Sequence, residues 1–225
     1  MSIKNTNIIF DFDSTLVQLE TIEILADFAL KDNKNKKEIL DEIKKMTSLA
    51  MSGKMPFDEA LNKRISLLHI NKSHINDTIK ALGKKLSNSF IENVEFIQNY
   101  AENCFVISGG FKEIIFQVLE PYGFKEKNIF ANSFIFNNDK IVNAVDSKNP
   151  LSQNNGKNII AKNIIGYNII IGDGFTDYEI KKNKNAEIFI LFTENIFRKE
   201  LNEKADFIAE NFYQAFNYIK HVRKK

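Results

Sequence analysis

Two carboxylates, Asp11 and Asp13, come directly after the apolar run Ile8–Phe10. If that run is a buried strand, alternate side chains share a face, and both carboxylates point the same way at its carboxyl end. Two like charges there repel each other and resist burial unless a cation lies beside them. A divalent metal ion with oxygen ligands, or a lysine, would meet that requirement. Taken alone, the pair fits a plain polar turn better than a site, so a functional interpretation needs partners elsewhere in the chain.

Further polar clusters supply such partners. Ser108-Gly109-Gly110 offers a hydroxyl and two unhindered backbone N–H groups before a predicted helix, an arrangement that suits an anion. The segment Gly172–Asp177 adds two more carboxylates after a second apolar run, and Lys157 adds an ammonium group at a helix start. Each cluster alone is common in turns, but together they match the needs of phosphoryl transfer, which are positioning and charge neutralisation. The sequence has no GxxxxGK[ST] loop, which disfavours nucleotide-dependent kinase chemistry.

The elements that must position these groups alternate in the second half of the chain. Apolar periodicity predicts helices near Phe90–Tyr100, Phe111–Tyr122, Lys157–Ile165, Thr176–Lys182 and Phe212–Val222, and strands at Cys104–Ile107, Ile129–Ala131, Asn168–Ile171 and Glu187–Leu191. Two β-like runs around Asn137–Asp139 predict a hairpin. Such alternation predicts an α/β fold, a doubly wound and mainly parallel sheet with helices on both faces. Ligands of these sheets bind at the carboxyl ends of the strands, where the polar clusters fall.

Residues 18–85 differ, because their apolar residues recur at helical spacing throughout. Four such sets occur, with a break at Gly53 and Pro56, at Ile22–Leu30, Ile39–Met46, Leu61–Leu68 and Ile75–Leu82. The sequence therefore predicts a core domain made of residues 1–17 and 86–225, and an inserted four-helix domain at 18–85.

Composition narrows the class of protein. The chain has 225 residues, of which 44% are hydrophobic and 27% charged, and its net charge of +2 gives no electrostatic case for nucleic acid. The single cysteine, Cys104, excludes an internal disulfide and fits a reducing compartment. No signal-like segment and no apolar span of membrane length occur, so we expect a cytoplasmic protein without a membrane partner.

With these residues in place, the chain resembles the haloacid dehalogenase (HAD) superfamily of phosphohydrolases. Its four motifs are matched, in the family's order, by Asp11–Thr15, Ser108–Gly110, Lys157 and Gly172–Asp177. The resemblance implies a HAD-type, Rossmann-like core with a four-helix-bundle cap of the C1 type. It also implies Mg²⁺-dependent hydrolysis of a small phosphomonoester.

The resemblance narrows to the phosphoserine phosphatase family, which shares the segment DSTLV and the pattern of the helical insertion. In that family a Glu contacts the amino group of the substrate and an Arg its carboxylate, which makes Glu20 and Arg64 the implied specificity pair. One carboxylate and one guanidinium complement a zwitterionic head group. Met51, Gly53 and Phe57 would line the closed pocket and exclude water, with residues 18–85 acting as a lid.

The same resemblance implies catalytic roles. Asp11 would attack phosphorus and form an aspartyl-phosphate, and Asp13 would protonate the leaving oxygen and then activate water. Mg²⁺ would be held by the Asp11 carboxylate, the Asp13 backbone carbonyl and Asp173. Asp177 would orient bound waters or Lys157 from behind these ligands.

The phosphoryl group would be bound by Ser108, the Gly109 N–H and Lys157, of which Ser108 and Lys157 also count as catalytic. Thr176 stands where many members have Asn, so the fine positioning of phosphate or water stays open. Two alternatives remain at this point. One is a HAD phosphatase for another small phosphomonoester such as phosphohomoserine, and the other is a non-catalytic phospho-ligand binding protein. The choice between Mg²⁺ and Mn²⁺ and the oligomeric state are left open.

Overall fold

The computed structural model describes residues 6–222 of the chain. Its strands are short and mostly buried, rich in the β-branched and aromatic residues that suit a sheet covered on both faces. They are β1 (Thr6–Phe10), β2 (Cys104–Phe111), β3 (Ile129–Asn132), β4 (Phe134–Phe136), β5 (Val142–Val145), β6 (Tyr167–Gly172), β7 (Ile188–Phe192) and β8 (Phe207–Ala209).

Six of the strands described in residues 6–222 form one sheet in the order β3-β2-β1-β6-β7-β8, and all neighbours pair in parallel. The chain leaves β1 for β2 on one side and returns to β6 on the other, so the end of β1 is a topological switch point. Phe10 lies opposite both Val106 and Ile171, which brings the carboxyl ends of these three strands to one edge. The predicted α/β architecture is therefore confirmed.

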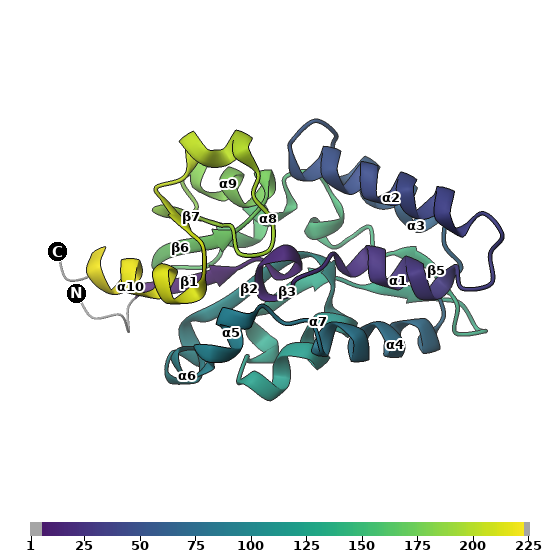
Figure 1. The fold of residues 1–225 in the computed structure, drawn as a ribbon, viewed down its shortest axis with the longest axis horizontal. Coiled ribbons are helices and arrows are strands. Elements are labelled where there is room, and N and C mark those ends of the chain that lie inside the picture. The colour runs from purple at the N-terminus through teal and green to yellow at the C-terminus, as the bar shows by residue number, and fades with distance from the viewer. Residues whose placement is uncertain (1–5, 223–225) are drawn as a thin grey trace.

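The helices surround this sheet (Figure 1). They are α1 (Thr21–Ala29), α2 (Lys36–Met51), α3 (Phe57–Ser66), α4 (Lys72–Gly83), α5 (Asn88–Glu92), α6 (Val94–Asn99), α7 (Lys112–Leu119), α8 (Gly156–Ala161), α9 (Phe175–Lys182) and α10 (Phe212–Val222). Ile8 and Phe10 belong to an apolar cluster with α7 and α10, whereas Ile9 between them packs with residues of α8 and α9. The strand's two-residue period thus supplies a separate core on each face of the sheet. None of the helices described in residues 6–222 is long and apolar enough to cross a membrane.

Helices α1 to α4 form the inserted helical unit between β1 and β2 (Figure 1). The two connecting segments run side by side, since Val17 pairs with Leu86 and the Gln18 N–H donates to Lys85 O at 2.8 Å. A second attachment lies further along the insertion, where the Val142 N–H of β5 donates to Ile70 O at 2.7 Å. The extent of the insertion as a domain, residues 18–85, stays a prediction.

The hairpin prediction is confirmed, because β4 and β5 pair antiparallel across the turn that follows Phe136. The single helix predicted over 90–100 was wrong. The chain there forms α5 and α6, separated by Asn93 with φ −118° and ψ 17°, which is not a helical conformation. Strand β8 was not predicted, because three residues at a sheet edge carry too little periodicity to be recognised.

The predicted end of the strand at Ile107, before Ser108-Gly109-Gly110, was also wrong. Strand β2 continues through these residues to Phe111, with a shift of its pairing register between Ile107 and Phe111. Helix α7 begins at Lys112. The glycine N–H groups therefore belong to an irregular extended segment rather than to the first turn of a helix.

Candidate active site

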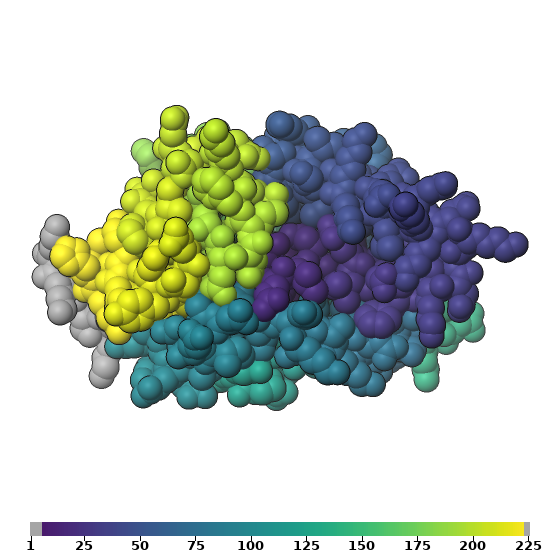
Figure 2. Space-filling view, in the orientation of Figure 1, coloured from purple at the N-terminus to yellow at the C-terminus, as the bar shows by residue number. Residues whose placement is uncertain are grey.

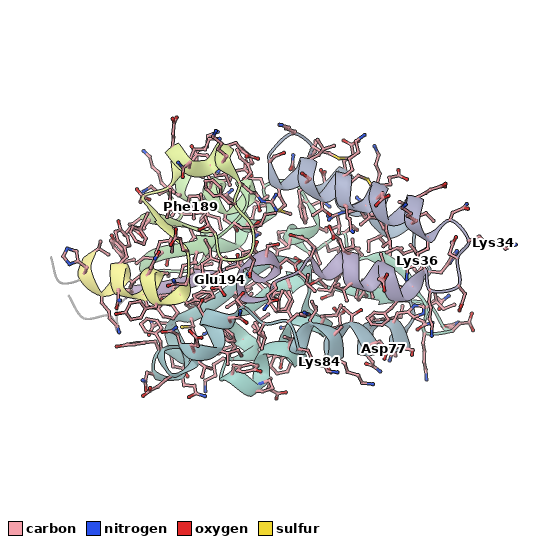
Figure 3. The ribbon with its side chains drawn as sticks, viewed as in Figure 1. Lys34, Lys36, Asp77, Lys84, Phe189 and Glu194 are labelled. Carbon is pink, nitrogen blue, oxygen red and sulfur yellow. The ribbon has the colours of Figure 1, made fainter. Side chains whose placement is uncertain are left out.

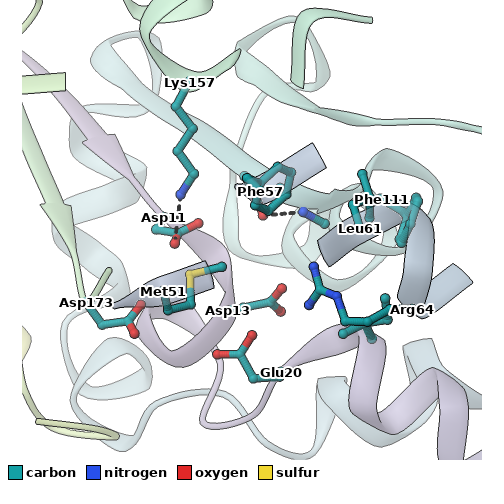
Figure 4. A pocket seen from close by; sticks show the side chains of 14 residues that line it. Asp11, Asp13, Glu20, Met51, Phe57, Leu61, Arg64, Phe111, Lys157 and Asp173 are labelled. Atoms are coloured by element: carbon teal, nitrogen blue, oxygen red, sulfur yellow. Dashed lines mark hydrogen bonds and ion pairs between the residues drawn. The ribbon is translucent and has the colours of Figure 1, made fainter. Parts of the chain in front are cut away.

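A pocket opens at the carboxyl edge of the sheet, under the inserted helices (Figure 4). Its walls come from both parts of the fold and include Asp11, Asp13, Glu20, Ile22, Met51, Phe57, Leu61, Arg64, Ser108, Gly109, Gly110, Phe111, Lys157 and Asp173. Gly53, Thr176 and Asp177 are not among these lining residues. Gly53 and Thr176 line an adjoining cavity between the insertion and α9.

The floor of the pocket is a buried charge network centred on Lys157. Its Nζ lies 2.8 Å from Asp11 Oδ2 and 2.7 Å from Asp177 Oδ1. Burial alone would lower the pKa of Lys157, but the charges of Asp11 and Asp177 outweigh it and raise that pKa. Burial, helped by the charge of Asp11, raises the pKa of Asp177 to about 8. Lysine and carboxylates thus neutralise one another in a space largely closed to water.

The first motif leaves β1 in a turn that redirects its carboxylates. Asp11 is extended, with φ −73° and ψ 163°, and its Oδ1 accepts the N–H of Phe12 at 2.7 Å. Ser14 adopts the left-handed region at φ 53°, and the Val17 N–H closes the turn on Phe12 O at 3.1 Å. Strand alternation therefore does not set the direction of Asp13, as the sequence had suggested; this turn does.

Asp13 is held by α1. Its Oδ1 accepts the backbone N–H of Thr21 at 2.9 Å and also the Thr21 hydroxyl. Removal from water, with the charges of Glu20 and Asp11, raises the pKa of Asp13 well above its ordinary value, while the bonds from Thr21 oppose the rise. A carboxyl group whose pKa is raised keeps its proton to a higher pH, which suits a general acid.

Ser108 and Gly109 form the wall opposite the first motif. The Ser108 hydroxyl accepts the N–H of Gly110 at 2.9 Å, and the Gly109 carbonyl accepts Asn132 Nδ2 at 3.0 Å. The ring of Phe57 lies against Gly109, so closely that a side chain at this position would collide with it. A glycine is required here because the insertion closes directly onto the strand.

Three buried carboxylates, Asp11, Asp173 and Asp177, could hold a metal ion, since one oxygen of each lies within 4.8 Å of the others. Burial raises the pKa of Asp173 to about 7, and the charges of Glu20 and Asp11 add to it. The three carboxylates lie too close together to be all ionised without a cation between them. Because Mg²⁺ prefers oxygen ligands, it is a suitable cation for this site. The carboxylate of Asp13 lies outside this group, and the expected role of its backbone carbonyl stays a prediction.

Arg64 reaches the pocket from α3 and is 3% exposed. Its Nε donates to Ala60 O at 3.0 Å and its Nη1 to Thr47 Oγ1 at 2.9 Å, which fixes the plane of the guanidinium. The guanidinium faces Asp13 and Glu20 (Figure 4). Burial lowers the pKa of Arg64, while the charges of Glu20 and Asp13 oppose that effect. A guanidinium so fixed retains a free edge for a planar anion.

Glu20 precedes α1 and accepts a hydrogen bond from Ser14 Oγ at 2.7 Å. Burial raises the pKa of Glu20, whereas the Ser14 hydroxyl and the charge of Arg198 lower it. Glu20 and Arg64 thus place opposite charges on the wall of the same pocket.

The inserted helices are closed onto the core. Gly53, at φ +74°, lies so near Phe175 that an added Cβ would stand 2.8 Å from the ring. The Phe57 N–H donates to Asn154 Oδ1 at 3.3 Å. Met51 lies over Gly174, with its Sδ 3.1 Å from where a Cβ would be. These contacts join the insertion to the core beside the pocket, and its role as a lid stays a prediction.

Thr176 carries a buried hydroxyl that has no hydrogen-bond partner among the described residues. It follows Phe175 in the first turn of α9, beside the cavity between the insertion and the core. A buried hydroxyl without a partner is costly unless a water or ligand reaches it.

Sequence reasoning missed Ile22 and Phe111 of the pocket lining, and it missed Thr21 and Arg198, which hold the acids of the site. Arg198 Nε lies 2.9 Å from Asp173 Oδ2, and its Nη2 lies 3.9 Å from Glu20 Oε1. The loop that carries Arg198 follows β7, a strand of the same sheet. The rule that strand ends face the ligand would have indicated this loop, but its single arginine carries no motif.

The fold and the buried acid and lysine cluster define a hydrolase of phosphate esters. The family model described as haloacid dehalogenase-like hydrolase matches residues 8–180. A phosphoserine phosphatase of Methanocaldococcus jannaschii is 32% identical over 229 residues, which cover 98% of this chain and all of that protein. The chain belongs to the haloacid dehalogenase-like hydrolases and, within them, to the phosphoserine phosphatase family.

Similar solved structures belong to the same family. A phosphoserine phosphohydrolase-like protein from Francisella tularensis matches with a TM-score of 0.86 and 30% identity, covering 95% of this chain and 99% of that one. A phosphoserine phosphatase described as a phospho-aspartyl intermediate analogue matches with a TM-score of 0.76 and 30% identity, covering 95% and 98% of the two chains.

Proposed function

We propose that this phosphatase hydrolyses O-phospho-L-serine to L-serine and phosphate with Mg²⁺, through an aspartyl-phosphate on Asp11. The observation that supports this substrate is the presence of Glu20 and Arg64 on the wall of the pocket that contains Asp11 and Asp13. Phosphoserine has an ammonium group for the first and a carboxylate for the second. A phosphomonoester without these groups would leave Glu20 with only the 3.9 Å contact to Arg198 and would bring no carboxylate to Arg64, and buried charges that are poorly paired are costly.

Asp11 is the nucleophile in this proposal. One of its oxygens accepts the Phe12 N–H and the other accepts Lys157, so the carboxylate is held in one orientation. A fixed carboxylate at a strand end can attack phosphorus with little loss of orientational freedom. The similar phosphoserine phosphatase structure that is described as a phospho-aspartyl intermediate analogue supports the same type of intermediate here.

Asp13 is the general acid and base in this proposal. Its raised pKa lets it give a proton to the leaving serine oxygen, and the resulting carboxylate then takes a proton from the attacking water. Thr21 holds Oδ1 throughout, which leaves Oδ2 to carry the proton. One residue thus serves both halves of the reaction.

Ser108, the Gly109 N–H and Lys157 bind the phosphoryl oxygens and offset the charge that develops there. The residues that would hold Mg²⁺ are Asp11, Asp173 and the backbone carbonyl of Asp13, with Asp177 placed to hold Lys157 and, from the same cluster, to orient metal-bound waters. When bound, Mg²⁺ supplies charge neutralisation at the phosphate. The closed insertion excludes water around Arg64 and strengthens each of these charge contacts.

The test is a substrate panel measured as phosphate release with and without Mg²⁺. We expect O-phospho-L-serine to have the highest kcat/KM, above phosphohomoserine, phosphothreonine, phosphocholine and sugar phosphates. A better rate on phosphocholine or a sugar phosphate would reject the assigned roles of Glu20 and Arg64. Absence of Mg²⁺-dependent release from every ester would favour a phospho-ligand binding protein instead.

A further inference from the structure

Arg198 occupies a position between the two halves of the site. Its Nε donates to Asp173 Oδ2 at 2.9 Å, and its Nη2 lies 3.9 Å from Glu20 Oε1. Its side chain is 7% exposed and is not among the residues that line the pocket. Arg198 therefore contacts the groups that would bind metal and substrate, and does not reach the reacting atoms from the pocket wall.

The loop that presents Arg198 is fixed at the connection between core and insertion. Asn195 Nδ2 lies within hydrogen-bond distance of Ser14 O at 3.1 Å, Val17 O at 3.3 Å and Ser87 Oγ at 2.7 Å. Glu194, labelled in Figure 3 near α5, accepts the Ser89 N–H at 3.1 Å and also the Ser89 hydroxyl. Figure 2 shows this C-terminal segment meeting the N-terminal segment and the insertion on one face. The loop is thus anchored on the segments that carry Asp13 and Glu20.

Charge explains why a cation is needed at this point. Five carboxylates meet in and below the pocket, namely Asp11, Asp13, Glu20, Asp173 and Asp177, against the cations Lys157, Arg64 and Arg198. Lys157 contacts Asp11 and Asp177, and Arg64 faces Asp13 and Glu20 on the other side of the pocket. Asp173 and Glu20 are left with Arg198 as the cation that contacts both.

We propose that Arg198 is a positioning residue that holds Asp173 in place for Mg²⁺ and Glu20 in place for the ammonium group of the substrate. By binding one oxygen of Asp173 with Nε, it leaves the other oxygen for the metal and prevents rotation of the carboxylate. The Glu20 half of the inference rests on the proposed function. The Asp173 half does not, because it concerns the metal alone.

The first experiment measures Mg²⁺ binding without substrate, by isothermal titration calorimetry on the metal-free protein. Arg198→Met should weaken Mg²⁺ binding by about 10- to 100-fold, the usual effect of losing a residue that orients a metal ligand. Lys199→Met removes a neighbouring exposed cation and should leave the affinity unchanged. An unchanged or tighter Mg²⁺ affinity in Arg198→Met would overturn the Asp173 half, since Arg198 would then be a bystander or a competitor of the metal.

Arg198→Lys covers the case in which Arg198→Met does not fold. Lysine keeps the buried charge but lacks the planar guanidinium that reaches two carboxylates at once. Its Mg²⁺ affinity should fall several-fold, and a wild-type affinity in this variant overturns the proposal equally.

The second experiment tests Glu20 at saturating Mg²⁺. The ratio of kcat/KM for O-phospho-L-serine to kcat/KM for 3-(phosphonooxy)propanoate, which lacks the ammonium group, should fall about tenfold in Arg198→Met, with Lys199→Met as the control. An unchanged ratio overturns the Glu20 half. If the wild-type protein itself shows no preference between the two esters, the proposed substrate fails and the Glu20 half with it, while the Mg²⁺ titration still decides the Asp173 half.

Discussion

Lys157 Nζ lies 2.8 Å from Asp11 Oδ2, and both side chains are less than one-tenth exposed. The lysine comes from the first turn of α8 and the aspartate from the end of β1, so the pair joins segments far apart in the sequence. Because the same ammonium also contacts Asp177, it holds Asp11, the proposed nucleophile, and a candidate metal ligand at a fixed separation.

Replacement of this lysine should therefore impair both catalysis and folding. Lys157→Met should reduce kcat/KM about 10²- to 10³-fold, the usual effect of losing one donor to a developing charge. It should also lower the free energy of unfolding of the metal-free protein by about 3–5 kcal/mol, because buried carboxylates are left without their cation. Steady-state kinetics and urea unfolding measure these effects. The exposed Lys162→Met is the control, and an equal loss in that variant would contradict the role given to Lys157.

Asp11→Asn tests the covalent step. Asparagine keeps the shape of the side chain and its contact with the Phe12 N–H, but an amide is a poor nucleophile toward phosphorus. We expect turnover to be lost and no acid-stable phosphate to remain on the protein after quenching with labelled phosphoserine. Turnover near the wild-type rate would show that another group attacks.

Arg64→Ala separates recognition from chemistry. Loss of a desolvated carboxylate contact costs about 2–5 kcal/mol, so KM for phosphoserine should rise far more than KM for p-nitrophenyl phosphate, which has no carboxylate. Arg64 also supports Thr47 of α2, so Arg64→Lys and the exposed Lys63→Ala are needed as comparisons. Equal losses on both substrates would mean that Arg64 acts through folding of the insertion alone.

Gly53→Ala tests closure of the insertion. Alanine is strained at φ +74°, and its Cβ would stand 2.8 Å from the Phe175 ring, so the insertion should no longer close fully. We expect kcat/KM to fall at least about tenfold and the free energy of unfolding to drop by about 1–2 kcal/mol. Gly83→Ala, where a Cβ meets nothing within 4 Å, should leave activity unchanged. Wild-type activity in Gly53→Ala would show that this contact does not govern closure.

Stability without metal should fall as pH rises. The pKa of Asp173 is raised to about 7 and that of Asp177 to about 8, and those of Asp13 and Glu20 are also raised. Between about pH 4 and pH 8 the folded protein therefore holds protons that the unfolded chain has released, and stability declines across this window. In EDTA, Tm should be lower at pH 8.5 than at pH 5.5, and Mg²⁺ should remove most of the difference.

Asp173→Asn provides the control for this pH dependence. It removes one of the raised groups and one candidate ligand, so both the decline with pH and the response to Mg²⁺ should shrink. A Tm in EDTA that rises between pH 5.5 and pH 8.5 would contradict the burial argument.

The sequence by itself determined the fold class and the polar clusters. Apolar runs such as Ile8–Phe10 predict strands because burial on both faces demands continuous apolar residues, and helical spacing in 18–85 predicts the insertion. The order of Asp11, Ser108, Lys157 and Asp173 along the chain was enough to indicate phosphoryl transfer, since each was predicted to lie at the end of a strand or the start of a helix at the same edge of the sheet.

The tertiary structure decided side-chain directions and long-range contacts that no local sequence pattern predicts. The direction of Asp13 depends on a left-handed Ser14 and on Thr21. Ser108-Gly109-Gly110 lie in a register shift between Ile107 and Phe111, the two residues on either side that pair with β3. Arg198 is one arginine in an irregular loop. It becomes part of the site because long-range packing brings Asp173 and Glu20 into contact with it. Sequence periodicity reports which face of an element is buried, but it does not report which distant charge a buried side chain meets.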